Sequence, residues 1–181
     1  IKLSAFSITL LVLINMKLEW MDSYLANAEQ MMYNNQVNEG LELMHELLYE
    51  EPGYGYLHNY LGWAYLYYTG DNAKAELHLK CAITFDGEYA PPYLHLGNLC
   101  IRAGRYSEAL QYLEAGVKKN SANKVAFLEH IAQVYELKRE YGQAIKYYKE
   151  ALVSTVGHET AQLSEGIKRC RKKRWVMMFS F

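Results

Sequence analysis

Apolar and small residues recur along the chain with a period of about 35 residues. Each copy is a pair of neighbouring residues followed by a third residue three positions later. The copies are Asn27-Ala28 with Met31, Leu61-Gly62 with Tyr65, Leu96-Gly97 with Cys100, and Ile131-Ala132 with Tyr135. An internal period of this length is typical of repeat architectures, in which one small structural unit is stacked several times.

Each copy is followed by a second apolar pattern with a spacing of four and then three residues. Its members are Gly40, Met44 and Leu47, then Ala75, Leu79 and Ala82, then Ala109, Leu113 and Gly116, and finally Ala144, Tyr148 and Ala151. That spacing places the residues on one face of an α-helix. Turn residues such as Gly70 and Gly104 separate the two patterns. The pairing predicts antiparallel helical hairpins, with small residues where the helices approach most closely.

The third copy is the clearest, with Tyr93, Leu96, Gly97, Cys100, Tyr106, Ala109, Leu113 and Gly116. It resembles the tetratricopeptide repeat signature W-x-x-L-G-x-x-Y followed by A-x-x-x-F-x-x-A. The resemblance spans roughly residues 21–156 and is weakest in the first copy. It implies an all-α fold, a right-handed α-solenoid of about four helix-turn-helix hairpins. Their expected ranges are about 21–53, 54–88, 89–122 and 123–156.

Segments outside the repeats need separate interpretations. Residues 1–15 form an apolar segment whose run of about 12 residues falls short of the roughly 20 that a membrane helix needs. It is interpreted as upstream read-through or an extra packing segment, with a signal or membrane anchor as the alternative. Met16 opens a plausible cytosolic start. Residues 157–174 are predicted to form a basic helix that caps the last repeat, and residues 175–181 are an apolar tail.

Composition and charge narrow the functional classes. The chain is 51% hydrophobic and 22% charged with a net charge of -1, as expected of a folded protein without overall attraction to nucleic acid or membrane. Three cysteines, Cys81, Cys100 and Cys170, form no C-x-x-C pair, so a disulfide framework or zinc site is not expected. Reduced thiols favour a cytoplasmic location. A membrane-anchored or exported protein is the alternative, through residues 1–15.

Catalytic and metal-binding motifs are missing from the sequence. Six histidines are spread over different predicted helices and none completes an H-E-x-x-H pair. The sequence also lacks G-x-S-x-G, a phosphate-binding loop and G-x-G-x-x-G. We therefore predict no enzyme, no metal, no cofactor and no small-molecule substrate.

The resemblance implies a binding groove, because the first helix of each tetratricopeptide hairpin lines the concave surface. The predicted groove residues are Tyr56, Asn59, Trp63, Tyr67, Leu94, Asn98, Arg102 and Gln133. The wider implied lining adds Asp22, Leu25, Glu29, Met32, Ile101, Glu129 and Glu136. Trp63 between two tyrosines is the expected hot spot, with packing against the neighbouring repeat as the alternative. Another protein or a peptide segment is thus the expected partner of this scaffold or adaptor.

A basic run is the densest charge in the chain. It comprises Lys168, Arg169, Arg171, Lys172, Lys173 and Arg174. Such a run can bind phosphate, RNA or an acidic partner, or can be a solvated face with favourable charge at a helix C-terminus. Only Trp175 at its edge offers a stacking platform, so we favour the solvated face over nucleic-acid binding. A membrane-tethered scaffold and a nucleic-acid-associated factor remain the alternative functions.

Overall fold

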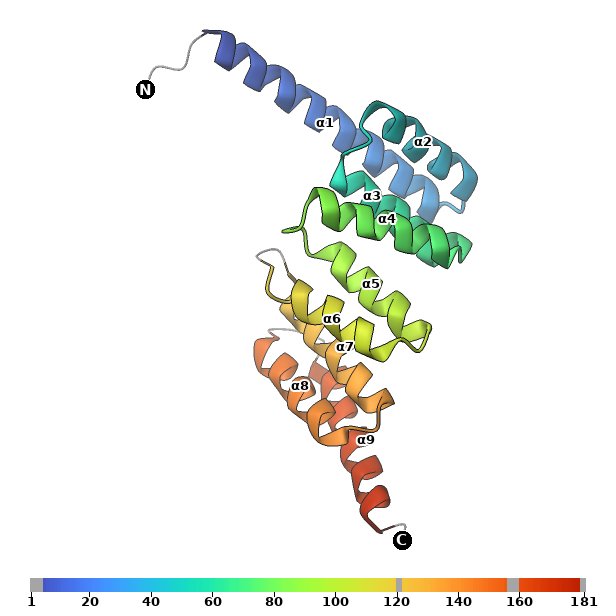
Figure 1. The fold of residues 1–181 in the computed structure, drawn as a ribbon, viewed down its shortest axis with the longest axis vertical. Helices are drawn as coiled ribbons and strands as arrows, with labels where there is room; N and C mark the ends of the chain where they lie inside the picture. The colour runs from blue at the N-terminus through green and yellow to red at the C-terminus, as the bar shows by residue number, and fades with distance from the viewer. Residues whose placement is uncertain (1–4, 120–121, 156–159, 180–181) are drawn as a thin grey trace. The chain divides into compact units, whose positions relative to one another are not determined.

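The computed structural model describes residues 5–119, 122–155 and 160–179, with side chains from residue 16 onward except residue 18. Within these residues all regular structure is helical (Figure 1). The chain divides into two compact units, Ile1–Phe85 and Asp86–Phe181, which we call unit 1 and unit 2. The predicted all-α fold is confirmed, and each unit contains two of the predicted hairpins.

Unit 1 consists of two hairpins that pack on each other. Its elements are α1 (Ala5–Tyr33), α2 (Val37–Glu50), α3 (Gly55–Ala64), a π-helical segment (Tyr65–Thr69) and α4 (Asn72–Phe85). Helix α1 contacts both α2 and α3, and α3 packs against α4. The apolar stripe of α2 is buried at Gly40, Met44 and Leu47, as the spacing predicts.

The small residues of the repeat pattern lie where the two helices of a hairpin meet. A Cβ atom added at Gly62 would lie 2.5 Å from Cγ of Leu79. One added at Gly97 would lie 2.5 Å from Cδ2 of Leu113. Both distances are well inside van der Waals contact, so a larger residue at either position would force the leucine side chain to move. The predicted close contacts are therefore confirmed in both units.

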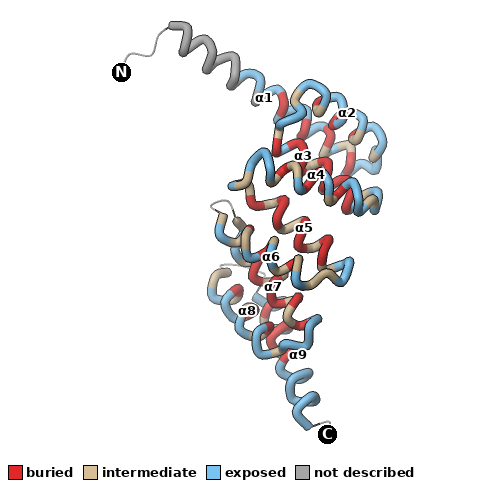
Figure 2. Tube along the Cα trace, viewed as in Figure 1, coloured by how far each residue is buried: buried red, intermediate tan, exposed pale blue. Residues whose placement is uncertain are grey.

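Unit 2 consists of two further hairpins and a closing helix. Its elements are α5 (Pro91–Arg102), α6 (Tyr106–Gly116), α7 (Lys124–Leu137), α8 (Tyr141–Ser154) and α9 (Thr160–Phe179). Helix α9 packs on α8, where Leu163, Ile167 and Cys170 join the core around Tyr148. The buried segments lie on the inner faces of the hairpins, and the end of α9 is exposed (Figure 2).

The turn inside each hairpin contains one residue in the left-handed conformation. These residues are Asn35, Gly70, Gly104 and Arg139, with φ between 63° and 73°. In the third hairpin the amide of Arg105 donates to the carbonyl of Cys100 at 2.8 Å, the bond that closes a Schellman motif. The first and fourth hairpins make the equivalent bond. One turn geometry thus recurs at the period of the sequence.

Both outer helices continue past the boundaries expected from the sequence. Helix α1 starts at Ala5, so residues 5–15 belong to the same helix as the first repeat. Helix α9 runs to Phe179 and includes most of the expected tail. Residues 1–4, the boundary at 156–157, and residues 180–181 lie outside the described part. Across the described ranges, none of the helices has both the length and the apolarity that a bilayer crossing requires.

Candidate functional site

A continuous set of aromatic rings extends over α1, α3 and the π-helical segment of unit 1. We call it the tyrosine strip. Its members are Tyr33, Tyr54, Tyr56, Tyr60, Trp63 and Tyr68. Successive ring centroids lie 5.0 to 6.3 Å apart, the range in which aromatic pairs attract each other. The strip is therefore a connected surface and not a scatter of separate side chains.

Two carboxylates on α1 fix the strip from one side. The Tyr54 hydroxyl donates to Asp22 at 3.0 Å, and the Tyr33 hydroxyl donates to Glu29 at 3.2 Å. Tyr60 makes a longer bond of 3.5 Å to the other oxygen of Glu29. Burial, followed by the charge of Glu29, raises the pKa of Tyr60 to about 12. The phenols thus stay neutral donors, and the two carboxylates lie at the hydroxyl ends of the rings.

A cleft of about 470 Å³ opens at one end of the strip, within the size range of small binding pockets. It is lined by Asp22, Leu25, Ala26, Tyr54, Tyr56 and Tyr60. An anionic carboxylate beside three electron-rich ring faces is an environment that attracts a cation. The cleft therefore has the chemistry to hold a lysine or arginine side chain.

The π-helical segment decides which tyrosine joins Trp63. Regular α-helical spacing would place Tyr67, four residues on, over the Trp63 ring. A π-helical turn holds more residues than an α-helical turn, so the fifth residue comes round instead. Tyr68 accordingly lies 5.0 Å from Trp63, ring centroid to ring centroid. The π-helical segment thus places Tyr68, and not Tyr67, beside Trp63.

A comparison with protein-family models finds a match in unit 2. The tetratricopeptide repeat model matches residues 93–124 and 128–160, the third and fourth hairpins. These two hairpins of unit 2 are tetratricopeptide repeats. No curated protein sequence matches it significantly.

Solved structures of low sequence identity share its fold. Pseudomonas aeruginosa PilF has a TM-score of 0.72 at 17% identity, covering 84% of this chain and 72% of that one. PilW, a type IV pilus biogenesis factor, has a TM-score of 0.71 at 16% identity, covering 84% and 74%. A thermophilic tetratricopeptide repeat protein of Thermus thermophilus has a TM-score of 0.63 at 20% identity, covering 84% and 80%. At these identities the similarity is one of fold, and it supports the helical-repeat class.

The predicted groove residues of the tetratricopeptide repeats fall into both units. In unit 1, Tyr56 is exposed and Trp63 half-buried, and both belong to the tyrosine strip. Trp63 also packs on Tyr33 of the neighbouring hairpin, as the alternative interpretation of this residue has it, and its role as a hot spot stays a prediction. Tyr67 is exposed, whereas Asn59 is 5% exposed and does not present its carboxamide on the surface. In unit 2, Arg102 is exposed, and the half-buried ones are Leu94, Asn98 and Gln133.

The residues of the wider lining implied by the tetratricopeptide resemblance differ in their burial and contacts. Asp22 and Glu29 reach the strip, but Leu25 and Met32 are core residues. Glu136 is buried because α9 covers it. Sequence reasoning did not single out Tyr33, Tyr54, Tyr60 or Tyr68. A signal existed for Tyr60, since residues 56, 60 and 63 have the spacing of one helix face.

The basic run on α9 is divided by its contacts. Arg169 and Lys173 both bind the carboxylate of Glu136, with nitrogen–oxygen distances of 2.7 Å. All six cations of the run, Lys168, Arg169, Arg171, Lys172, Lys173 and Arg174, are exposed. The solvated face stays a prediction, and two of its cations also form ion pairs between α9 and α7.

Three histidines from different helices of unit 1 lie close together, although they are far apart in the sequence. Nδ1 of His58 lies 3.1 Å from Nδ1 of His78, and Nε2 of His45 lies 2.8 Å from the Tyr65 hydroxyl. Burial, with the charges of His58 and His45, lowers the pKa of His78 to about 4. Among the described residues, no group of histidine, cysteine and acidic side chains has the arrangement of a metal site. His58 and His78 are buried polar residues of the core, and exposed His45 lies at its edge.

Proposed function

We propose that this protein is a non-enzymatic scaffold that binds an extended, basic segment of another protein on the tyrosine strip. The observation behind the proposal is the pairing of six connected aromatic rings with Asp22 and Glu29. Tetratricopeptide repeats generally serve protein interaction, which supports the class of function. A cytoplasmic location belongs to the proposal through the three reduced cysteines.

The chemistry of the strip selects the partner. Rings held by carboxylates lose little conformational entropy on binding, because their phenols are already fixed. A lysine or arginine above such a ring gains roughly 0.5–2 kcal/mol from the cation–π attraction, and more from the neighbouring carboxylate. An acidic segment would meet repulsion from Asp22 and Glu29. We therefore infer a segment in which basic residues alternate with small or apolar ones.

The test uses the full chain and a phage-displayed random peptide library. Selected peptides should be enriched in lysine and arginine, and one of them then serves as a labelled probe. Trp63→Ala and Tyr60→Ala should each weaken its binding about tenfold or more, as expected of a hot spot. Leu77→Ala is the control, because this apolar side chain is exposed on α4 outside the strip.

Two outcomes would contradict the proposal. One is a selection without enrichment of basic residues, which would remove the chemical specificity. The other is a probe whose affinity is unchanged by Trp63→Ala while circular dichroism shows the same helix content and melting temperature. In that case the strip is a packing element, and Leu94, Asn98, Arg102 and Gln133 of unit 2 are the next residues to test.

A further inference from the structure

The two units carry opposite charge. Residues 1–85 contain 4 basic and 10 acidic residues, a formal net charge of -6. Residues 86–181 contain 15 basic and 10 acidic residues, a formal net charge of +5. The near-neutral total conceals this difference. Two copies of the chain consequently attract each other when unit 1 of one approaches unit 2 of the other.

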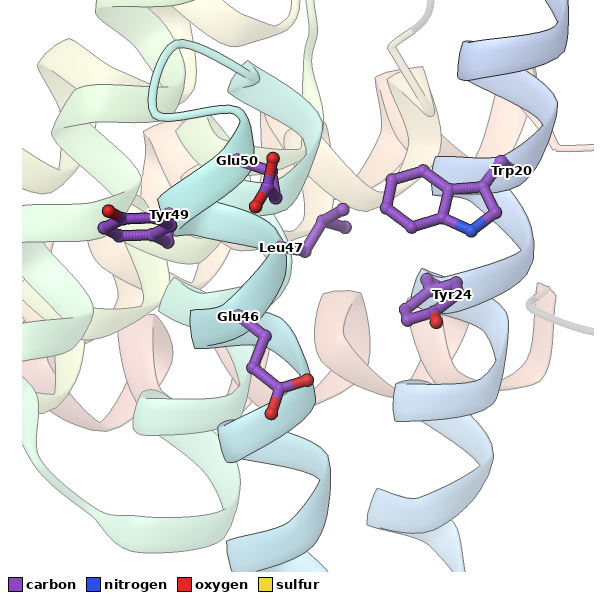
Figure 3. Close-up of a pocket in the computed structure, with 6 residues that line it drawn as sticks. All are labelled: Trp20, Tyr24, Glu46, Leu47, Tyr49 and Glu50. Carbon is purple, nitrogen blue, oxygen red and sulfur yellow. The ribbon is translucent and has the colours of Figure 1, made fainter.

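An acidic apolar cleft lies on the face of α1 and α2 in unit 1, separate from the tyrosine strip (Figure 3). It encloses about 500 Å³, and its lining residues are Trp20, Tyr24, Glu46, Leu47, Tyr49 and Glu50. Trp20 and Tyr24 extend from α1 toward Leu47 of α2 (Figure 3). Both rings are more than one-third exposed, and Trp20 is 43% exposed. Apolar walls with two glutamates one helical turn apart suit an amphipathic helix with cations on it.

Helix α9 of unit 2 presents the complementary surface. Beyond Cys170 it is exposed in every described residue through Phe179. Lys168, Arg171, Trp175, Met178 and Phe179 follow the spacing of one helix face, and we call them the α9 stripe. Trp175 is 62% and Phe179 65% exposed, with ring centroids 5.1 Å apart. Such paired exposed aromatics on a folded helix mark an interaction surface.

We propose that the α9 stripe of one copy docks in the α1–α2 cleft of a second copy. Trp175 and Phe179 then cover Trp20, Tyr24 and Leu47. Lys168 and Arg171 are about one helical turn apart, and so are Glu46 and Glu50. The two cations of one copy can therefore form ion pairs with the two glutamates of the other at the same time. The contact is heterologous, so each pair of copies keeps one open cleft and one open stripe. Assembly therefore continues with rising concentration or closes into a ring.

The experiment measures the molar mass of the full chain in reducing buffer by sedimentation velocity over a range of concentrations. The native chain should gain mass with concentration, and added salt should shift association to higher concentration. Glu46→Lys/Glu50→Lys and Lys168→Glu/Arg171→Glu should each stay monomeric. An equimolar mixture of the two variants should associate again, because every cleft then meets a stripe of opposite charge. Trp175→Ala/Phe179→Ala should weaken association of the native chain at least about tenfold.

Matched controls separate the cleft from general charge effects. Glu39→Lys/Glu42→Lys makes the same charge change on α2 outside the cleft lining and should associate like the native chain. Trp63→Ala should associate normally too, since the tyrosine strip takes no part. A monomer mass that stays constant with concentration overturns the proposal. This is also the result expected if α9 binds within its own copy. So does a mixture that remains monomeric, or a control that dissociates like the cleft variant.

Discussion

Arg169 binds Glu136 with two parallel hydrogen bonds, from Nε to Oε1 and from Nη2 to Oε2, each 2.7 Å long. The two residues are 33 positions apart and join α9 to α7. Tyr148 of α8 donates to the same carboxylate at 3.2 Å. Three helices thus meet at one buried charge. The hydrogen bonds from Arg169, opposed by burial and aided by Lys173, lower the pKa of Glu136 to about 2.

Breaking this contact should loosen the end of unit 2. Arg169→Met leaves a buried carboxylate with fewer donors, so we expect a loss of about 1–3 kcal/mol in the free energy of unfolding by urea at neutral pH. The depressed pKa of Glu136 gives stability that is present above pH 4.5 and lost as the pH falls toward 2. The difference between Arg169→Met and the native chain should therefore shrink in that window. Arg171→Met, an exposed neighbour, should cost less than about 0.5 kcal/mol.

Arg139 occupies a turn position that glycine fills in two other hairpins. Its φ is 63°, whereas Gly70 and Gly104 have φ of 73° and 72°. A side chain in the left-handed region costs about 1 kcal/mol, more than the entropy that glycine loses there. Arg139→Gly should therefore raise the free energy of unfolding by about 0.5–1 kcal/mol. Gly104→Arg should lower it by a similar amount, and a gain in stability from that change would refute the argument.

The sequence was sufficient for the repeat period, the hairpins and their close contacts. The reason is that each depends on local spacing, such as Gly62 opposite Leu79 or the stripe of Gly40, Met44 and Leu47. Glycine marks the turns at Gly70 and Gly104. At Arg139 the period also predicts the break between the helices, but it does not show that this ordinary residue adopts the left-handed conformation.

The site was less predictable, because it depends on contacts between helices and on one irregular turn. The register through Trp63 pointed to Tyr67, and the π-helical segment brings Tyr68 to that ring. The burial of Glu136 depends on α9, which lies 33 residues further along the chain at Arg169. No periodicity within a single repeat contains that information.

Gly116 stands where the second and fourth repeats have alanine, and its surroundings explain why. A Cβ atom there would lie 2.4 Å from Cε1 of Phe127 and 2.6 Å from Cβ of Tyr93. Gly116→Ala should therefore destabilise the protein by about 1–3 kcal/mol through overpacking. Phe127→Leu removes part of the clash, so the double variant should lose less than the sum of the two single losses. Strict additivity in urea unfolding would show that the helices simply move apart.

The histidine pair of unit 1 should make folding sensitive to mild acid. Nε2 of His58 lies 2.9 Å from the carbonyl oxygen of Pro52, which only accepts, so Nε2 carries the hydrogen. Nδ1 of His58 then accepts from Nδ1–H of His78 at 3.1 Å. Because the pKa of His78 falls from 6.5 to about 4, the unfolded chain binds a proton in this window that the folded chain does not. Lowering the pH from 6.5 to 4 should thus reduce the free energy of unfolding by about 2 kcal/mol through this residue. His78→Gln should reduce that slope in urea titrations at several pH values. Equal slopes for the native chain and His78→Gln would exclude His78 as a sensitive group.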